Sequence, residues 1–110
     1  MIVVPAEVQD SMIAHRRHLH ANPEVGIQLP KTHGYIAQVL ESLGFVTEVV
    51  PGGGVTTRIL GSNPNLKPII FRADMDALPV LEELDLDYCS KNHGAMHACG
   101  HDLHMATLLG

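Results

Sequence analysis

Residues 74–100 show neither helical nor strand periodicity, and this long irregular stretch most constrains how a chain of 110 residues can fold. Irregular segments of this length in small domains are usually functional loops or disordered segments. The chain is 45% hydrophobic and 17% charged, which is typical of folded proteins and disfavours disorder. Its length allows one ordinary domain at most. We therefore expect a functional loop held on one small core.

Composition and charge exclude several classes of protein. The net charge of −5 argues against a nucleic-acid-binding face, which needs clustered basic residues. No apolar run approaches the roughly 20 residues of a membrane helix. The start of the chain lacks the basic flank and long apolar stretch of a signal peptide. Two cysteines cannot build a disulfide framework, so we expect a reducing, cytoplasmic setting with free or metal-bound thiols.

Regular structure is predicted on both sides of the irregular stretch. Apolar residues at helical spacing predict helices over residues 5–21 and 31–43, the first ended by the proline that follows Asn22. A last helix is predicted to begin at Asp102, acting as its N-cap. Three short segments rich in β-branched or apolar residues predict strands, the last of them buried: 45–50, 55–60 and 69–71.

Potential metal ligands are most concentrated in residues 96–104. Thiolate and imidazole are common zinc ligands, and on an extended segment Cys99 and His101 would point to the same side. Gly100 between them allows a tight turn or a close approach of the backbone to an ion. If a helix begins at Asp102, its N-terminal dipole would favour the Cys99 thiolate. These features predict a metal site.

Two other interpretations of this cluster stay open. His97, His101 and His104 are spaced four and three residues apart, so on a continuous helix they would share one face. The intervening Gly100 disfavours such a helix. The structural alternative is a histidine-rich surface loop with one buried cysteine.

A second group of candidate residues follows the predicted strand 69–71. Asp74 and Asp76 stand two residues apart, just beyond the carboxyl end of that strand, where ligand sites of open α/β sheets lie. Such a pair can hold a hard cation or orient ligand histidines. The alternative is a solvated loop whose aspartates form Asx-turns.

Other polar groups predict surfaces rather than sites. Residues 15–20 carry two arginines and three histidines and predict a charged helix face, with a phosphate or carboxylate site as the alternative. Glu82 and Glu83 predict an exposed acidic loop, with a general base and a metal ligand as the alternative. Residues 51–54 lack the Gly-Lys-Ser/Thr ending of a phosphate loop and predict a hairpin turn. Cys89 is predicted to be half-buried.

Three motifs, taken in order, resemble one known family. They are the segment 16–26, the run Arg-Ala-Asp-Met-Asp-Ala-Leu-Pro at 72–79, and Met-His-Ala-Cys-Gly-His-Asp-Leu-His at 96–104. Together they resemble the amidohydrolase branch of the aminoacylase/carboxypeptidase metallopeptidases. This branch includes hippurate hydrolases, N-acyl-amino-acid deacylases, N-acetyldiaminopimelate deacetylases and auxin-conjugate hydrolases. The resemblance covers nearly the whole chain.

The resemblance implies an α/β fold and an enzymatic function. The chain would be the N-terminal portion of a three-layer α/β/α metallopeptidase-like catalytic domain, truncated at Gly110 and without the family's smaller dimerisation domain. Members hydrolyse the amide bond of small-molecule N-acyl amino acids, and the full-length protein would be a homodimer. The alternative is a non-catalytic metal-binding fragment. Neither nucleic acid nor membrane is an expected partner.

The resemblance also implies roles for particular residues. Cys99 and His101 match ligands of a site for two divalent ions, Mn²⁺ or Zn²⁺, and Asp76 matches a supporting catalytic residue. Four further residues lie in the motifs as second-shell or possible site residues, without an assigned ligand role: Asp74, His97, Asp102 and His104. In the family, the general base belongs to a Glu-Glu pair that follows the Cys-Gly-His-Asp motif. The base and the remaining ligands are therefore expected beyond Gly110, and this chain alone is expected to be inactive.

Overall fold

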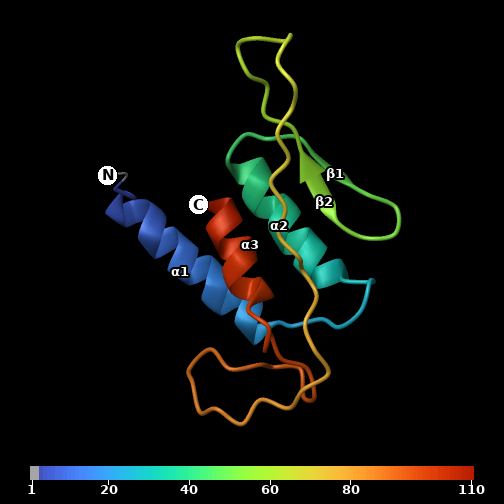
Figure 1. Cartoon of the computed structure of the whole chain (residues 1–110). Helices are drawn as coiled ribbons and strands as arrows, with labels where there is room; N and C mark the ends of the chain where they lie inside the picture. Colours follow the sequence, from blue (N-terminus) through green and yellow to red (C-terminus); the bar gives the residue numbers. More distant parts are fainter. Residues whose placement is uncertain (1–2) are drawn as a thin grey trace.

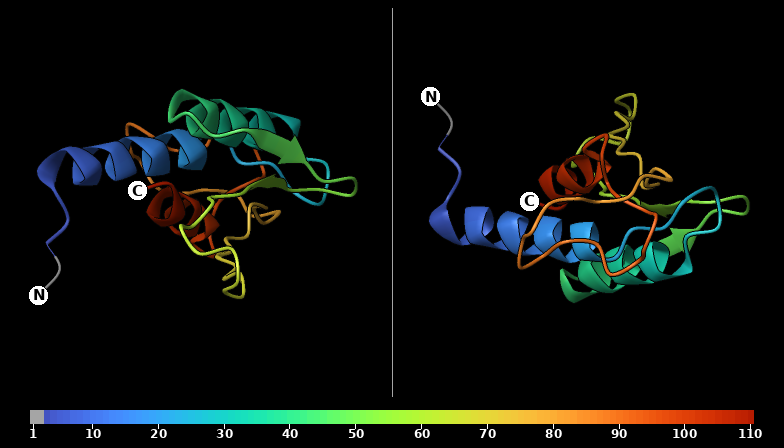
Figure 2. Two further views of the ribbon diagram at one scale, coloured as in Figure 1. Left: turned by 90° about the horizontal axis from the view of Figure 1, so that it is seen from above. Right: turned by 90° about the horizontal axis from the view of Figure 1, so that it is seen from below.

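The computed structural model describes residues 3–110, in which three helices and one antiparallel hairpin surround a small core (Figure 1). The elements are α1 (Ala6–Ala21), α2 (Pro30–Ser42), β1 (Thr47–Val49), β2 (Val55–Thr57) and α3 (His101–Leu109). α1 packs against α3, and α2 packs against both strands. The hairpin lies at the opposite end of the molecule from the start of α1 (Figure 2). Within the described residues, none of the helices has the length and apolarity needed to cross a bilayer.

Both predicted N-terminal helices are confirmed, and local sequence explains where they end. α1 ends at Asn22, because the residue before a proline is pushed out of the helical region. α2 ends in a Schellman motif around Gly44, which has a φ of 90°. The Gly44 N–H donates to the Glu41 carbonyl at 3.0 Å, and the Phe45 N–H donates to the Leu40 carbonyl at 3.1 Å.

The predicted hairpin is present but shorter than its sequence pattern. Residues 47–49 pair antiparallel with residues 55–57, with Val49 opposite Val55. The turn is closed by the Val50 N–H, which donates to the Gly54 carbonyl at 2.9 Å. Three successive glycines with positive φ form the turn, a conformation that only glycine adopts readily. The hairpin turn, rather than a phosphate loop, is therefore confirmed.

The prediction of a buried strand over residues 69–71 is wrong for this structure. Ile69, Ile70 and Phe71 are 80%, 86% and 76% exposed, and none lies in a strand. A strand needs a hydrogen-bonding neighbour, and the two-stranded sheet ends with β2. The radius of gyration, 15.1 Å, exceeds the value of about 13 Å expected for a compact domain of this length. The apolar segment 69–71 is therefore exposed, in a chain that is less compact than a typical domain of its length.

The irregular stretch 74–100 is held by backbone hydrogen bonds to the last residue of α1, to the segment that follows α1, and within the stretch itself. The Ala77 N–H donates to the Glu24 carbonyl at 2.8 Å, and the Lys91 N–H donates to the Ala21 carbonyl at 2.9 Å. Leu78 and Met96 exchange a reciprocal pair of hydrogen bonds at 2.9 and 3.0 Å. These contacts bring the segment around Asp76 and the segment before Cys99 to the same end of the molecule (Figure 1).

Leu19, Ile36 and Met105 form the centre of the core, one from each helix. Leu19 is 2% exposed and is among the largest fully buried side chains. Tyr35 and Leu109 are among the partly buried residues that pack around these three. The core therefore joins α1, α2 and α3, and it fixes the start of α3 relative to the other helices.

α3 begins at His101, and its N-cap is Gly100 rather than the predicted Asp102. The Gly100 carbonyl accepts from the N–H groups of Leu103 and His104, both at 3.1 Å. Gly100 has a φ of 92°, in the left-handed region that favours glycine. Asp102 lies inside the first turn, where its carboxylate accepts from the N–H of Leu103 at 2.9 Å.

This geometry predicts opposite effects for two glycine substitutions. Gly100→Ala is expected to lower the free energy of unfolding by about 1–2 kcal/mol, because L-residues are strained at this φ. Gly34→Ala, inside α2 and with open space around the added methyl group, is expected to raise it by about 0.5–1 kcal/mol. Urea unfolding of the two variants checks this. Equal changes of the same sign in the free energy of unfolding would contradict the left-handed conformation assigned to Gly100.

Candidate metal centre

Cys99 and His101 flank the turn that starts α3. Cys99 is exposed and has a free thiol. His101 is the first residue of the helix, and its side chain is 17% exposed. The left-handed Gly100 between them turns the chain from the loop into the helix. A cysteine thiol and an imidazole thus stand at one accessible turn, and both side chains are ligand types suited to zinc and similar cations.

His101 is oriented by Asp76. Its Nδ1 lies 2.8 Å from the Asp76 carbonyl oxygen and 3.1 Å from the Asp76 carboxylate. Both partners only accept hydrogen bonds, so Nδ1 carries the proton and Nε2 presents its lone pair. This arrangement is the usual outer-shell support of a metal-ligating histidine. The structure therefore brings together His101 and Asp76, two of the residues singled out by the sequence.

The other candidate residues lie in different surroundings. Asp74 forms an ion pair with Arg72 at the surface. His104 is exposed one turn along α3, with its ring centroid 5.8 Å from that of His101. His97 is 4% exposed, and neither of its ring nitrogens has a hydrogen-bond partner. Burial lowers the pKa of His97, which favours the neutral imidazole.

The candidate ligands do not form a complete metal site among the residues that the structure describes. Across residues 3–110, no group of three or more His, Cys, Asp or Glu side chains is arranged to hold an ion. Two donors of suitable type, one with its tautomer fixed, are nonetheless present at the turn. The residues fit a divalent cation that takes further ligands from elsewhere.

Four side chains form a buried ion cluster beside this turn: Arg16, His20, Glu82 and Asp102. His20 Nδ1 lies 2.7 Å from the Asp102 carboxylate, and His20 Nε2 lies 2.8 Å from the Glu82 carboxylate. Arg16 Nε donates to the same Asp102 oxygen at 3.1 Å. The His20, Glu82 and Asp102 side chains are 3%, 4% and 1% exposed. Arg16, at 33% exposed, closes the cluster toward solvent.

The cluster corrects two predictions. Glu82 does not lie in an exposed acidic loop, because His20 and the Ser90 N–H hold its two carboxylate oxygens. The predicted charged helix face of α1 is also wrong for His20, which is buried. Arg16 and His20 instead contact carboxylates within the same chain. Cys89 is half-buried, as predicted.

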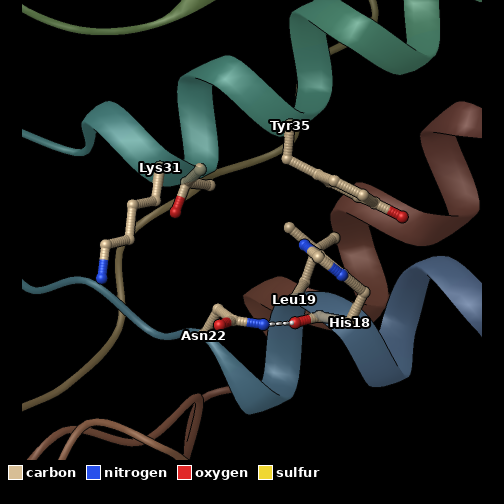
Figure 3. Close-up of a pocket in the computed structure, with 6 residues that line it drawn as sticks. His18, Leu19, Asn22, Lys31 and Tyr35 are labelled. Atoms are coloured by element: carbon tan, nitrogen blue, oxygen red, sulfur yellow. Dashed lines mark hydrogen bonds between the residues drawn. The ribbon is translucent and has the colours of Figure 1, made fainter.

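The remaining histidines of α1, His15 and His18, contact Tyr35 of α2, and Figure 3 shows the contact of His18. The ring of His18 stacks on Tyr35 at a centroid distance of 3.8 Å, and His15 Nδ1 lies 2.7 Å from the Tyr35 hydroxyl oxygen. Burial lowers the pKa of both histidines. The adjoining pocket of about 230 Å³ is lined by neither Cys99 nor His101, so it is separate from the candidate metal centre.

Sequence reasoning missed the cluster, although one signal was available. Arg16 and His20 stand four residues apart on α1, so they share a helix face. Their partners could not be found from the sequence, because Asp102 and Glu82 lie 82 and 62 residues from His20 along the chain.

The cluster predicts a loss of stability in acid. Burial would raise the pKa of the Glu82 carboxyl, but hydrogen bonds from His20 and the Ser90 N–H, and the nearby positive charges, hold it below its ordinary value of 4.5. The ionised Glu82 carboxylate therefore adds to the free energy of unfolding at pH values above 4.5. This contribution is lost as the pH falls through the lower pKa that Glu82 has in the folded protein. In Glu82→Gln, the free energy of unfolding is expected to fall less steeply as the pH is lowered.

Denaturant unfolding between about pH 3 and pH 7 checks this expectation. The matched control is Glu83→Gln, since Glu83 is the exposed neighbour of Glu82. An equally steep acid decline in Glu82→Gln and in the unmodified protein would contradict the assignment.

Comparison with known proteins places this geometry in context. The sequence profile of "Peptidase family M20/M25/M40" matches residues 70–110. The chain is 47% identical to an N-acyl-L-amino acid amidohydrolase of Geobacillus stearothermophilus, over 94% of this chain and 28% of that protein. It is 46% identical to an N-acetyldiaminopimelate deacetylase of Oenococcus oeni, over 92% of this chain and 28% of that protein.

A solved structure has the same fold. The Bacillus subtilis YXEP protein, described as a dinuclear metal-binding peptidase of the M20 family, matches with a TM-score of 0.87 and 38% identity, over 96% of this chain and 30% of that one. The predicted fold class, part of an α/β metallopeptidase-like domain, is confirmed. The chain thus spans somewhat more than a quarter of the length of these relatives.

Proposed function

Because residues 70–110 match the profile of peptidase family M20/M25/M40 and the chain is 47% identical to part of an N-acyl-L-amino acid amidohydrolase, we propose that it is part of a family member and contributes Cys99 and His101 to a divalent-metal centre that hydrolyses the amide bond of N-acyl amino acids. The observation that carries this proposal is the state of His101. Its Nδ1 is hydrogen-bonded to Asp76, and its Nε2 remains available to bind a metal ion.

Each residue has a defined task in this proposal. Cys99 and His101 bind a cation, and Asp76 keeps the imidazole in the tautomer that can do so. When bound, divalent cations at such a site activate a water molecule and polarise the scissile carbonyl. Glu82 takes no part as a base, because both of its oxygens are engaged and its side chain is 4% exposed. From the resemblance to the family, we propose as the proton acceptor a glutamate of the Glu-Glu pair that follows the Cys-Gly-His-Asp motif in its members.

The substrate class follows from the relatives. One acts, by its name, on N-acyl-L-amino acids and another on N-acetyldiaminopimelate, so an acyl group on an amino-acid nitrogen is the shared feature. We propose two cations for the complete site, as in the dinuclear neighbour. Mn²⁺ and Zn²⁺ are the candidates, because thiolate and imidazole suit zinc while carboxylates also admit manganese. A dimerisation domain, a homodimer and a cytoplasmic location stay predictions.

Metal removal from the full polypeptide tests the function. N-acetyl and N-benzoyl amino acids are offered as substrates, and release of the free amino acid is measured. Chelation is expected to abolish hydrolysis, and addition of Mn²⁺ or Zn²⁺ to restore it. Hydrolysis that survives complete metal removal would overturn the proposal. Tight metal binding without turnover of either substrate would also overturn it, in favour of a non-catalytic metal-binding protein.

A further inference from the structure

We propose that the buried ion cluster of Arg16, His20, Glu82 and Asp102 positions the first turn of α3 and so holds Cys99 and His101 ready for the metal. This inference rests on the proposed function. The four are positioning residues: they act through the ligands and touch neither metal nor substrate. Only Asp102 belongs to the metal motif; Arg16, His20 and Glu82 are brought to it by the fold.

The start of α3 is held from two directions. Asp102, the residue after His101, is 1% exposed and accepts hydrogen bonds from His20 and Arg16 of α1. His101 is held by Asp76, on the irregular segment. Successive side chains on a helix point about 100° apart, so these two restraints act on different faces of the same turn. Together they oppose rotation of α3 about its axis, the motion that would swing the imidazole away.

Glu82 extends the restraint to the loop beneath the turn. Its second oxygen accepts from the Ser90 N–H, which ties residues 82–90 to His20. Tyr88 from the same loop packs with its ring 5.6 Å from that of His20, and the guanidinium carbon of Arg16 lies 5.1 Å from the Tyr88 ring centroid. The loop thus covers the cluster and keeps water from its hydrogen bonds.

The chemistry of the cluster favours positioning over stability alone. Burying charges is costly, and well-packed apolar side chains often stabilise a fold as much or more. Charged hydrogen bonds, in contrast, have fixed directions and lengths. Both ring nitrogens of His20 lie within hydrogen-bond distance of a carboxylate, and Arg16 contacts the Asp102 carboxylate as well, so each side chain in the cluster has a polar partner. Such a cluster specifies one orientation of α3, which an apolar contact would not.

The test compares cluster variants of the full polypeptide for affinity toward Co²⁺ alone. Asp102→Asn and His20→Gln remove the charge pair with little change of volume. We expect their dissociation constants for Co²⁺ to rise about 10–100-fold, the range seen for outer-shell partners of metal ligands. We also expect the thiolate-to-cobalt absorption band of Cys99 to shift or weaken. Both readouts are measured at temperatures where circular dichroism shows the variants folded.

Two further variants keep the test decisive if Asp102→Asn or His20→Gln does not fold. Arg16→Gln alters the one partly exposed member and is expected to weaken Co²⁺ binding several-fold. Arg16→Lys keeps the positive charge and is expected to restore much of that loss. If Arg16→Gln binds Co²⁺ as tightly as the unmodified protein does, the proposal is wrong.

The matched control breaks a polar contact elsewhere. Glu24 accepts from the N–H and hydroxyl of Thr32 at 2.7 and 2.8 Å, capping the start of α2. Glu24→Gln is expected to lower Tm but leave Co²⁺ affinity unchanged. Cluster variants that lose Tm like Glu24→Gln and also keep their Co²⁺ affinity would show a purely structural role and overturn the inference.

The two proposals fail in different ways. If Cys99→Ala and His101→Ala leave Co²⁺ binding unchanged, the proposed function fails. If those variants lose Co²⁺ while His20→Gln and Asp102→Asn keep it, the metal site stands and the positioning role of the cluster fails.

Discussion

His101→Ala is expected to lower the metal affinity of the full polypeptide by more than about a hundredfold and to abolish hydrolysis. Loss of an outer-shell partner already costs 10–100-fold, and a ligand that is itself held by Asp76 contributes more. Metal content after dialysis and release of the amino acid are the measurements. His104→Ala is the matched control, because His104 is exposed on the same helix. Retained metal and activity in His101→Ala would contradict the assignment.

Cys99→Ser offers a chemically independent check of the same site. An alcohol is a far poorer ligand than a thiolate, so metal affinity is expected to fall, most strongly for zinc. Cys89→Ser is the control, since Cys89 is the other free cysteine and is half-buried. If Cys89→Ser lost metal and Cys99→Ser did not, the thiol ligand would have been assigned to the wrong cysteine.

Leu19→Ala is expected to lower the free energy of unfolding by about 2–5 kcal/mol, the largest effect on stability that we predict for a single apolar truncation. Leu19 is 2% exposed and contacts the core from α1, between Ile36 and Met105. Its loss opens a cavity where all three helices meet, and close-packed surroundings fill such a cavity only in part.

Chemical denaturation of the full polypeptide measures this effect. Ile13→Ala is the control on the same helix, because Ile13 is 51% exposed and its truncation is expected to change stability by about 0.5 kcal/mol or less. A loss below about 1 kcal/mol in Leu19→Ala would mean that the three helices are not joined through this residue.

Predictions from local patterns succeeded where the interaction is local. The end of α2 depends on Gly44 and on hydrogen bonds within five residues, and the hairpin turn depends on three consecutive glycines. Both are encoded by neighbouring residues, so a pass along the sequence finds them. The start of α3 was placed one residue late, because Asp102 has the chemistry of an N-cap but is used for a longer-range contact.

Predictions failed where the partner is distant. The apolar run 69–71 has the pattern of a buried strand, but strand formation needs a neighbouring strand, and none pairs with it in the described part of the chain. Glu82 looked like a solvated acid because its sequence neighbours are acidic. Its burial depends on His20, which lies on another element.

The sequence by itself determined the two N-terminal helices, the glycine hairpin and the chemical identity of the candidate ligands Cys99 and His101. These depend on backbone preferences and side-chain chemistry, which act over a few residues. Only the tertiary structure decided that Asp76 fixes the His101 tautomer and that Asp102 and Glu82 flank His20. The physical reason is that buried polar groups must find partners wherever the fold brings them, and for His20 those partners lie 62 and 82 residues away.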